Sequence, residues 1–146
     1  MKAPANLYVR IDNARLAELV TRAEDTSGEC CGFLLGHDRG GRIVSAVIPA
    51  LNIAKNPRMH FEIDPLEYLR AEQYAAQHKL ELIGIYHSHP NGTAVPSETD
   101  RRMAQPYFSY VILSMIDQQF DDIRSWRLNH LQQFEEEPII SSVLCS

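Results

Sequence analysis

The strongest constraint on the fold of this chain is an apolar run at residues 80–86 that leads into His-Ser-His-Pro at residues 87–90. The run is typical of a buried central strand. Because side chains alternate along a strand, His87 and His89 are expected on one face, and Ser88 on the other, where it would be structural or would support the metal-binding residues. Two imidazoles on one face, at positions i and i+2, can bind the same metal ion. The end of this strand is therefore predicted to form a metal site.

Asp100 completes the predicted ligand set. Ten residues separate His89 from Asp100, so a short loop can return this carboxylate to the strand end. Two histidines and one carboxylate leave a fourth tetrahedral position open for water, which distinguishes a catalytic zinc site from a closed structural one. Zinc lowers the pKa of such a water to about 7, which supplies hydroxide near neutral pH.

The same residues also allow a purely structural interpretation. Histidines at a strand end often make ordinary hydrogen bonds. Residues 96–100 are typical of a helix start, with Ser97 as the N-cap and Asp100 three residues later in a capping box. The combination of paired histidines, a Pro-Asn-Gly loop and a spaced acid favours the metal site.

A carboxylate opens the apolar segment at residues 28–36. Glu29 is either solvated at the edge of this strand or functional. A general base beside a metal-bound water would satisfy the chemistry of hydrolysis. The spacing alone does not decide between the two interpretations.

Taken together, these residues resemble the JAMM motif of the Mov34/MPN/PAD-1 metallopeptidases. That motif consists of Glu, a long gap, His-x-His, ten residues and Asp, with a serine three residues before the Asp. The segments at residues 52–57 and 61–65 are similar to the short stand-alone prokaryotic members, and the resemblance spans about residues 7–136. The matching residues here are Glu29, His87, His89, Ser97 and Asp100.

The resemblance implies a role for each motif residue. His87, His89 and Asp100 would be the ligands of one zinc ion per chain. Glu29 would act as the general base, taking a proton from the attacking water and passing it to the leaving amine. Ser97 would donate a hydrogen bond to the oxyanion, a contact whose loss costs about 3 kcal/mol in other hydrolases.

The resemblance also implies a fold class, namely α/β with the cytidine-deaminase-like MPN (JAB1/MPN) fold, a mixed β-sheet flanked by helices. The residue patterns predict elements of the same class. The Pro-Cys-x-x-Cys half of the deaminase signature is absent, so deaminase chemistry is not expected. Strands are expected at residues 7–11, 30–36, 42–50, 59–63, 80–88, 107–115 and 123–131, and helices at residues 13–24 after an Asp12 N-cap, 65–78 after Asp64, and 97–104.

Composition narrows the function classes. A chain of 146 residues is long enough to bury its own core, so one domain covering residues 1–146 is expected. A net charge of −5, with no basic run longer than Arg101-Arg102, argues against nucleic-acid binding. Neither a signal core nor an apolar run of membrane-spanning length is visible, which favours the cytoplasm.

Three cysteines without framework spacing argue against a disulfide scaffold. Cys30 and Cys31 are expected to be small buried residues, and Cys145 a free thiol in the tail. The apolar tail at residues 138–145 predicts an edge strand of the chain's own sheet. Alternatively, the tail pairs with a second subunit, which leaves a homodimer open.

Members of the resembled family cut peptide or isopeptide bonds after the C-terminal Gly-Gly of ubiquitin or ubiquitin-like proteins. The short connections at residues 37–41 and 105–106 resemble the compact prokaryotic form. The leading hypothesis is therefore processing of a ubiquitin-like or sulfur-carrier protein with a Gly-Gly tail. Two alternatives stay open: a metallohydrolase of small molecules or peptides, and a catalytically inactive MPN scaffold that binds partners.

Overall fold

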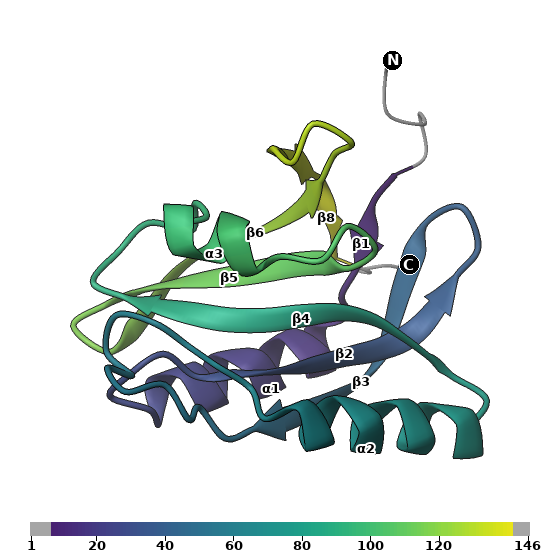
Figure 1. The fold of residues 1–146 in the computed structure, drawn as a ribbon, viewed down its shortest axis with the longest axis horizontal. Helices are drawn as coiled ribbons and strands as arrows, with labels where there is room; N and C mark the ends of the chain where they lie inside the picture. The colour runs from purple at the N-terminus through teal and green to yellow at the C-terminus, as the bar shows by residue number, and fades with distance from the viewer. Residues whose placement is uncertain (1–6, 142–146) are drawn as a thin grey trace.

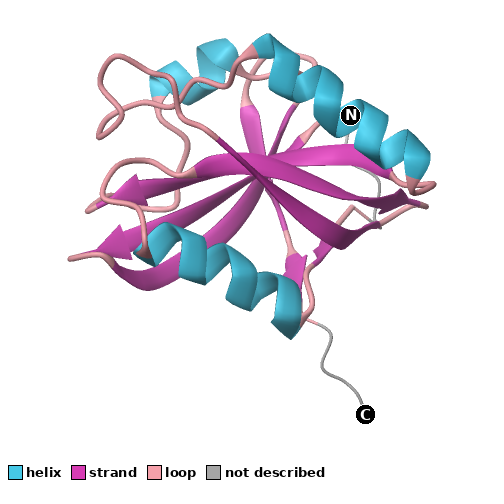
Figure 2. Cartoon of the chain, turned by 90° about the horizontal axis from the view of Figure 1, so that it is seen from below, coloured by secondary structure: helices cyan, strands magenta, loops and turns pink. Residues whose placement is uncertain are grey.

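The computed structural model describes residues 7–141, which form a mixed β-sheet with helices on both faces (Figures 1 and 2). The strands are β1 (Val9–Arg10), β2 (Cys31–Asp38), β3 (Arg42–Ala50), β4 (Glu81–Pro90), β5 (Ser109–Ile116), β6 (Gln119–Leu128), β7 (Phe134–Glu137) and β8 (Ile139–Ile140). The helices are α1 (Asn13–Glu24), α2 (Pro65–Gln77) and α3 (Glu98–Met103). The α/β class with a mixed sheet, expected from the sequence, is confirmed.

β4 lies inside the sheet, whose strand order is β7-β6-β5-β4-β2-β3-β1-β8. It runs antiparallel to β2 and parallel to β5. Parallel neighbours require a crossover connection, and α3 lies in the connection from β4 to β5. This topology places the start of α3 close to the carboxyl end of β4.

The two long helices cover opposite cores, and both expected caps are confirmed. The Asp12 carboxylate accepts a hydrogen bond from the first turn of α1, and the Asp64 carboxylate accepts one from the first turn of α2. On the α1 side, Leu19 packs in a core with side chains of β4 and β5. On the α2 side, Ala71 and Ala75 pack in a second core with side chains of β2 and β4.

A β-bulge interrupts the pairing of β4 with β2. Leu34 pairs with Gly84 and Leu35 with Leu82, which leaves Ile83 without a partner on β2. The guanidinium of Arg42, only 2% exposed, donates a hydrogen bond of 2.9 Å to the Ile83 carbonyl. A buried cation therefore satisfies the polar backbone group that the bulge exposes.

The strand expected at residues 59–63 is wrong. The backbone N–H groups of Met59 and His60 both donate to the Asn56 carbonyl at 3.1 Å, as in a turn. The N–H of Glu62 donates to the side-chain oxygen of Asn52 at 3.1 Å. Local turn bonds and one asparagine side chain thus use the donors that a strand would offer to a neighbour.

The C-terminal part of the chain differs in detail from expectation. β8 pairs in parallel with β1, so the predicted edge strand is confirmed for residues 139–140, whereas Cys145 lies outside the described residues. β7 was not expected, because its sequence has no apolar alternation, yet it pairs with β6. No helix within residues 7–141 is long and apolar enough to cross a membrane. The expected cytoplasmic location and the homodimer stay predictions.

Candidate metal centre

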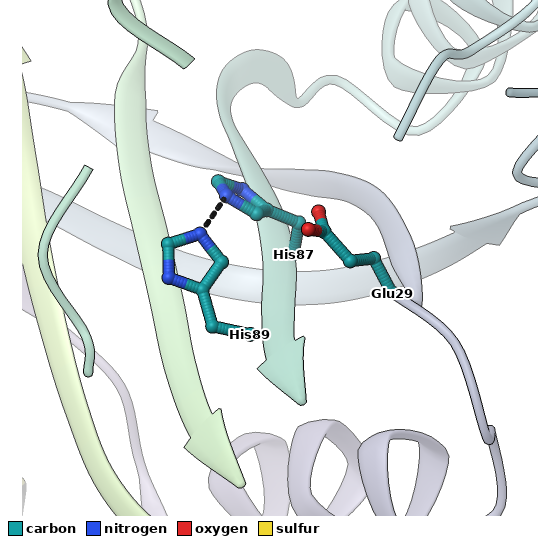
Figure 3. Close-up of side chains that lie close together, drawn as sticks. All are labelled: Glu29, His87 and His89. Atoms are coloured by element: carbon teal, nitrogen blue, oxygen red, sulfur yellow. Dashed lines mark hydrogen bonds between the residues drawn. The ribbon is translucent and has the colours of Figure 1, made fainter. Parts of the chain in front are cut away.

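Three polar side chains converge at the carboxyl end of β4. The Nε2 atoms of His87 and His89 point toward each other and lie 3.1 Å apart, with the ring planes tilted by 59° (Figure 3). Oδ2 of Asp100 lies 3.1 Å from each of these nitrogens. A tetrahedral metal with bonds of about 2.0–2.1 Å holds its ligand atoms roughly 3.3 Å apart. The three atoms therefore fit the coordination sphere of one metal ion.

Neighbouring groups orient both imidazoles. Nδ1 of His89 lies 2.7 Å from the carbonyl oxygen of Thr93. An Nδ1–H donated to that carbonyl leaves the lone pair of Nε2 facing the cluster, as a metal ligand requires. The ring of His87 is 1% exposed and stacks on Phe61 with ring centroids 4.3 Å apart.

The pKa shifts of the three residues differ in direction. Burial lowers the pKa of His87, which favours the neutral ring that binds metals. Burial acts in the same direction on His89, but hydrogen bonds with Asp100 and Thr93 outweigh it and raise the pKa of His89. Burial would raise the pKa of Asp100, yet its hydrogen bonds with the two histidines hold it well below its usual range. The cluster thus presents an ionised carboxylate.

The capping box predicted at the start of α3 is confirmed. Oγ of Ser97 accepts a hydrogen bond of 3.0 Å from the N–H of Asp100, and Oδ2 of Asp100 accepts one of 2.9 Å from the N–H of Ser97. The cap uses a lone pair of the Ser97 oxygen and leaves its hydroxyl proton free to donate. The structural and functional interpretations of this segment are therefore compatible.

Glu29 lies beside the histidines, two residues before β2 begins. One atom from each of Glu29, His87 and His89 falls in a group whose members are all within 4.8 Å of one another (Figure 3). Asp100 approaches both histidines more closely, at 3.1 Å, so it belongs to the tight cluster and Glu29 to its border. Glu29 is 5% exposed, and its Oε1 has no hydrogen-bond partner among the described residues. Burial raises the pKa of Glu29 to about 8, where a carboxyl can both accept and donate a proton near neutral pH.

The loop before α2 positions the backbone of Glu29. The N–H of Glu29 donates to the Pro57 carbonyl at 2.7 Å, and the side-chain amide of Asn52 donates to the Glu29 carbonyl at 2.9 Å. A Cβ atom at Gly28 would lie 2.8 Å from the Pro57 oxygen, closer than Cβ contacts allow. Glycine at position 28 therefore permits the approach that fixes Glu29.

Some positioning residues were not identified as such from the sequence. Asn52 and Phe61 fall within segments whose family resemblance was noted, and that resemblance was the available signal. Thr93 acts through its backbone carbonyl and left no signal in the sequence. Ser88, expected to be structural, is fully buried and accepts a hydrogen bond from the N–H of Cys30 at 2.9 Å.

A pocket of about 280 Å³ lies beside the histidine–carboxylate cluster, with His87 and Asp100 in its wall. The rest of the wall is largely apolar and aromatic and comes from the loop before α2 and from α2, α3, β5 and β7. It includes Phe61, Tyr68, Met103, Tyr110 and Phe134. The cluster therefore borders a space that suits an apolar side chain.

Comparison with known proteins gives consistent matches. Residues 13–129 match the family model of prokaryotic homologs of the JAB domain. A desampylase of Haloferax volcanii is 40% identical over 93 residues, which are 63% of this chain and 66% of that protein. A probable TtuB-protein conjugate cleaving protease of Thermus thermophilus is 36% identical over 94 residues, 64% of this chain and 60% of that protein. The chain thus spans less than two thirds of either relative.

Two further matches cover most of the chain. A CysO-cysteine peptidase of Mycobacterium tuberculosis is 31% identical over 125 residues, 84% of this chain and 84% of that protein. The solution structure of a protein from Desulfitobacterium hafniense matches with a TM-score of 0.81 and 31% identity, over 93% of this chain and 92% of that one. The expected fold is confirmed by this likeness.

Proposed function

Because the chain belongs to the family of prokaryotic JAB-domain proteins, we propose that it is a zinc-dependent peptidase or isopeptidase. Its substrate would be a ubiquitin-like or sulfur-carrier protein, cut after the C-terminal Gly-Gly. The observation that carries this proposal is the convergence of two histidines and Asp100 on one point, with the buried carboxyl of Glu29 beside them. Three protein ligands and a free position are typical of catalytic zinc sites.

The named relatives support the substrate class. One is described as a protease that cleaves protein conjugates, one as a desampylase, and one as a peptidase for a CysO-cysteine adduct. Carried over to this chain, these names favour a small protein modifier or carrier as the acyl part of the substrate. Its extended tail would lie over His87 and Asp100, where the pocket of about 280 Å³ can accept an apolar side chain.

Each residue of the candidate site would have its own role in the reaction. His87, His89 and Asp100 would hold zinc, which when bound acidifies the attacking water and polarises the scissile carbonyl. Glu29 takes one proton from the attacking water as the water oxygen adds to the carbonyl carbon. Ser97 donates its hydroxyl proton in a hydrogen bond to the carbonyl oxygen as negative charge develops there.

The second half of the reaction breaks the C–N bond. Glu29 returns its proton to the nitrogen of the leaving amine, and the carbonyl reforms as the carboxylic acid of the shortened carrier. One water is consumed, and one acid and one amine are produced. Because Glu29 ends in its starting protonation state, the chain itself is unchanged after each turnover.

The decisive experiment is cleavage of a carrier protein whose C-terminal Gly-Gly is joined to a reporter. We expect the zinc-loaded protein to release the carrier with Gly-Gly at its end and the His89→Ala variant to release none. A carrier ending in Ala-Ala is the control for specificity. If folded, zinc-loaded protein cleaves no Gly-Gly-linked carrier, the proposed substrate class is wrong. Turnover of small dipeptides by the same sample would then favour a general metallopeptidase.

A further inference from the structure

The loop that returns Asp100 to the histidines is held by side chains. This return loop, residues 91–97, connects β4 to α3. Within the described part of the chain, no backbone–backbone hydrogen bond involves residues 93–96. Ala94, 2% exposed, is the only buried residue of the return loop. The polar backbone atoms of this segment must therefore find their partners among side chains or water.

Side-chain donors from the sheet hold the carbonyls on either side of Thr93. The Ser114 hydroxyl, on β5, donates to the Gly92 carbonyl at 2.5 Å. Nε1 of Trp126, on β6, donates to the Ala94 carbonyl at 2.9 Å. Because peptide groups are planar, fixing the peptide before and the peptide after leaves little freedom to the one between them. The position of the Thr93 carbonyl is therefore set from both sides.

The Thr93 carbonyl influences which nitrogen of His89 can bind a metal. Its oxygen lies 2.7 Å from Nδ1, whereas Oδ2 of Asp100 lies 3.1 Å from Nε2. A neutral imidazole has one N–H, so the two oxygens compete for the same proton. Only a ring with its proton on Nδ1 has an Nε2 lone pair that faces the cluster. A well-placed Thr93 carbonyl therefore favours the metal-binding form of the ring.

Trp126 also supports the segment that carries Asp100. Its partner Ala94 lies five residues after His89 and six before Asp100, so the contact holds the connection near its middle. Trp126 lines a hollow of about 220 Å³ together with Ser97, whose backbone N–H and hydroxyl both bond to Asp100 in the capping box. One indole thus anchors the chain between two predicted metal ligands.

We propose that Trp126 and Ser114 are positioning residues for His89. They act through the return loop, by holding the Thr93 carbonyl where it keeps the proton of the ring on Nδ1. The inference rests on the proposed function, in which His89 is a metal ligand. Groups that orient metal-binding histidines typically change metal affinity about 10- to 100-fold when they are lost.

Zinc affinity tests the inference without any turnover. In competition with a chromophoric chelator, Trp126→Phe and Ser114→Ala should each bind zinc about 10-fold more weakly than the wild type, because each loses a donor to the return loop. Ser125→Ala is the matched control. It removes a buried hydroxyl that donates to Glu137 at 2.7 Å, next to Trp126 on β6 but on the opposite face. This variant should lose stability and keep the zinc affinity of the wild type.

The chain has a single tryptophan, which allows the N–H alone to be removed. Trp126→benzothienylalanine keeps the shape of the fused ring and replaces the N–H by sulfur. Its zinc affinity should fall as in Trp126→Phe, whereas Trp126→fluorotryptophan, which keeps the N–H, should bind zinc like the wild type. Equal zinc affinity in the wild type, Trp126→benzothienylalanine and Ser114→Ala would overturn the inference and leave the proposed function standing.

The proton on the His89 ring gives a readout that needs no metal. In metal-free protein at alkaline pH, where the ring is neutral, NMR of the ring nitrogens should place this proton on Nδ1 in the wild type. In Trp126→Phe and Ser114→Ala it should shift towards Nε2, where Asp100 accepts it. A wild type that binds no zinc, although the ring proton moves in both variants, would contradict the proposed function and leave the positioning of His89 standing.

Discussion

The hydroxyl of Ser88 accepts a hydrogen bond of 2.9 Å from the backbone N–H of Cys30, and the Cys30 carbonyl accepts one of 3.0 Å from the N–H of Ser88. Ser88 lies between the two histidines, and Cys30 directly follows Glu29. This pair of bonds therefore joins the predicted metal ligands to the proposed general base, across 58 residues of sequence.

Replacing Ser88 by alanine should separate the position of Glu29 from metal binding. Ser88→Ala leaves the buried N–H of Cys30 without its side-chain acceptor, which should cost about 1–3 kcal/mol of unfolding free energy. We expect zinc content to stay near that of the wild type and kcat to fall about 10-fold. Metal analysis and carrier cleavage measure the two effects, with exposed Ser45→Ala as the control. Loss of zinc in Ser88→Ala would show that the bond holds the histidines rather than Glu29.

Zinc content distinguishes a ligand from a base. Glu29→Gln should keep about one zinc per chain and lose turnover, because the amide cannot accept a proton. His89→Ala should lose zinc, because one of three ligands is missing. Plasma mass spectrometry of the purified proteins measures both. Equal loss of zinc in the two variants would identify Glu29 as a ligand, since it lies within 4.8 Å of the histidine atoms.

The raised pKa of Glu29 predicts a pH dependence of stability. Between the ordinary value of 4.5 and the folded value of about 8, the folded metal-free protein keeps a proton that the unfolded chain has released. The stability that this proton contributes is complete below 4.5 and is lost as the pH rises to about 8.

Glu29→Gln should abolish this dependence. Relative to the variant, the metal-free wild type should lose on the order of 1 kcal/mol or more between about pH 5 and pH 8, because its buried carboxyl must ionise in the folded state. Urea unfolding in the presence of a chelator measures the difference in unfolding free energy between the two proteins. His89 and Asp100 are present in both proteins, so their contributions to the pH dependence cancel to first order. Parallel pH profiles of the two proteins would show that Glu29 is ionised already at low pH.

Two substitutions of Ser97 separate its cap from its hydroxyl. Glycine is nearly as good an N-cap as serine, whereas alanine costs about 1 kcal/mol. Ser97→Gly and Ser97→Ala should therefore differ in thermal stability but share a loss in kcat of about 100-fold, since both lack the donor to the oxyanion. If the loss of kcat follows the loss of thermal stability across the two variants, Ser97 contributes only by capping the helix and positioning Asp100.

Arg42 is predicted to support the sheet far from the chemistry. Its guanidinium donates to the Ile83 carbonyl, the Ser109 hydroxyl and the Tyr107 carbonyl, and it pairs with Asp38 at 3.1 Å. Arg42→Met should cost about 3 kcal/mol of unfolding free energy, because it leaves these buried groups unpaired. Zinc content below the unfolding temperature should not change. A stable Arg42→Met protein would show that the bulge at Ile83 is satisfied in another way.

Local sequence patterns were sufficient to predict the helices and the strand that carry the candidate site. The Asp12, Asp64 and Ser97 caps are confirmed because capping depends on residues within one helical turn. The apolar run of β4 identified a buried strand and put both histidines on one face. The strand predicted at residues 59–63 is absent, because their alternating pattern does not reveal that oxygens of Asn52 and Asn56 already accept hydrogen bonds from their backbone donors.

The sequence by itself determined the predicted ligand types and their spacing, because His-x-His and Asp100 stand at fixed intervals, and the resemblance to a known family added Glu29 across a long gap. Tertiary structure alone decided that Glu29 reaches the histidines and what surrounds it. That proximity depends on Cys31 pairing with His87 across β2 and β4, and on the loop that carries Pro57. Strand register and loop packing arise from contacts between distant segments, which no local periodicity encodes.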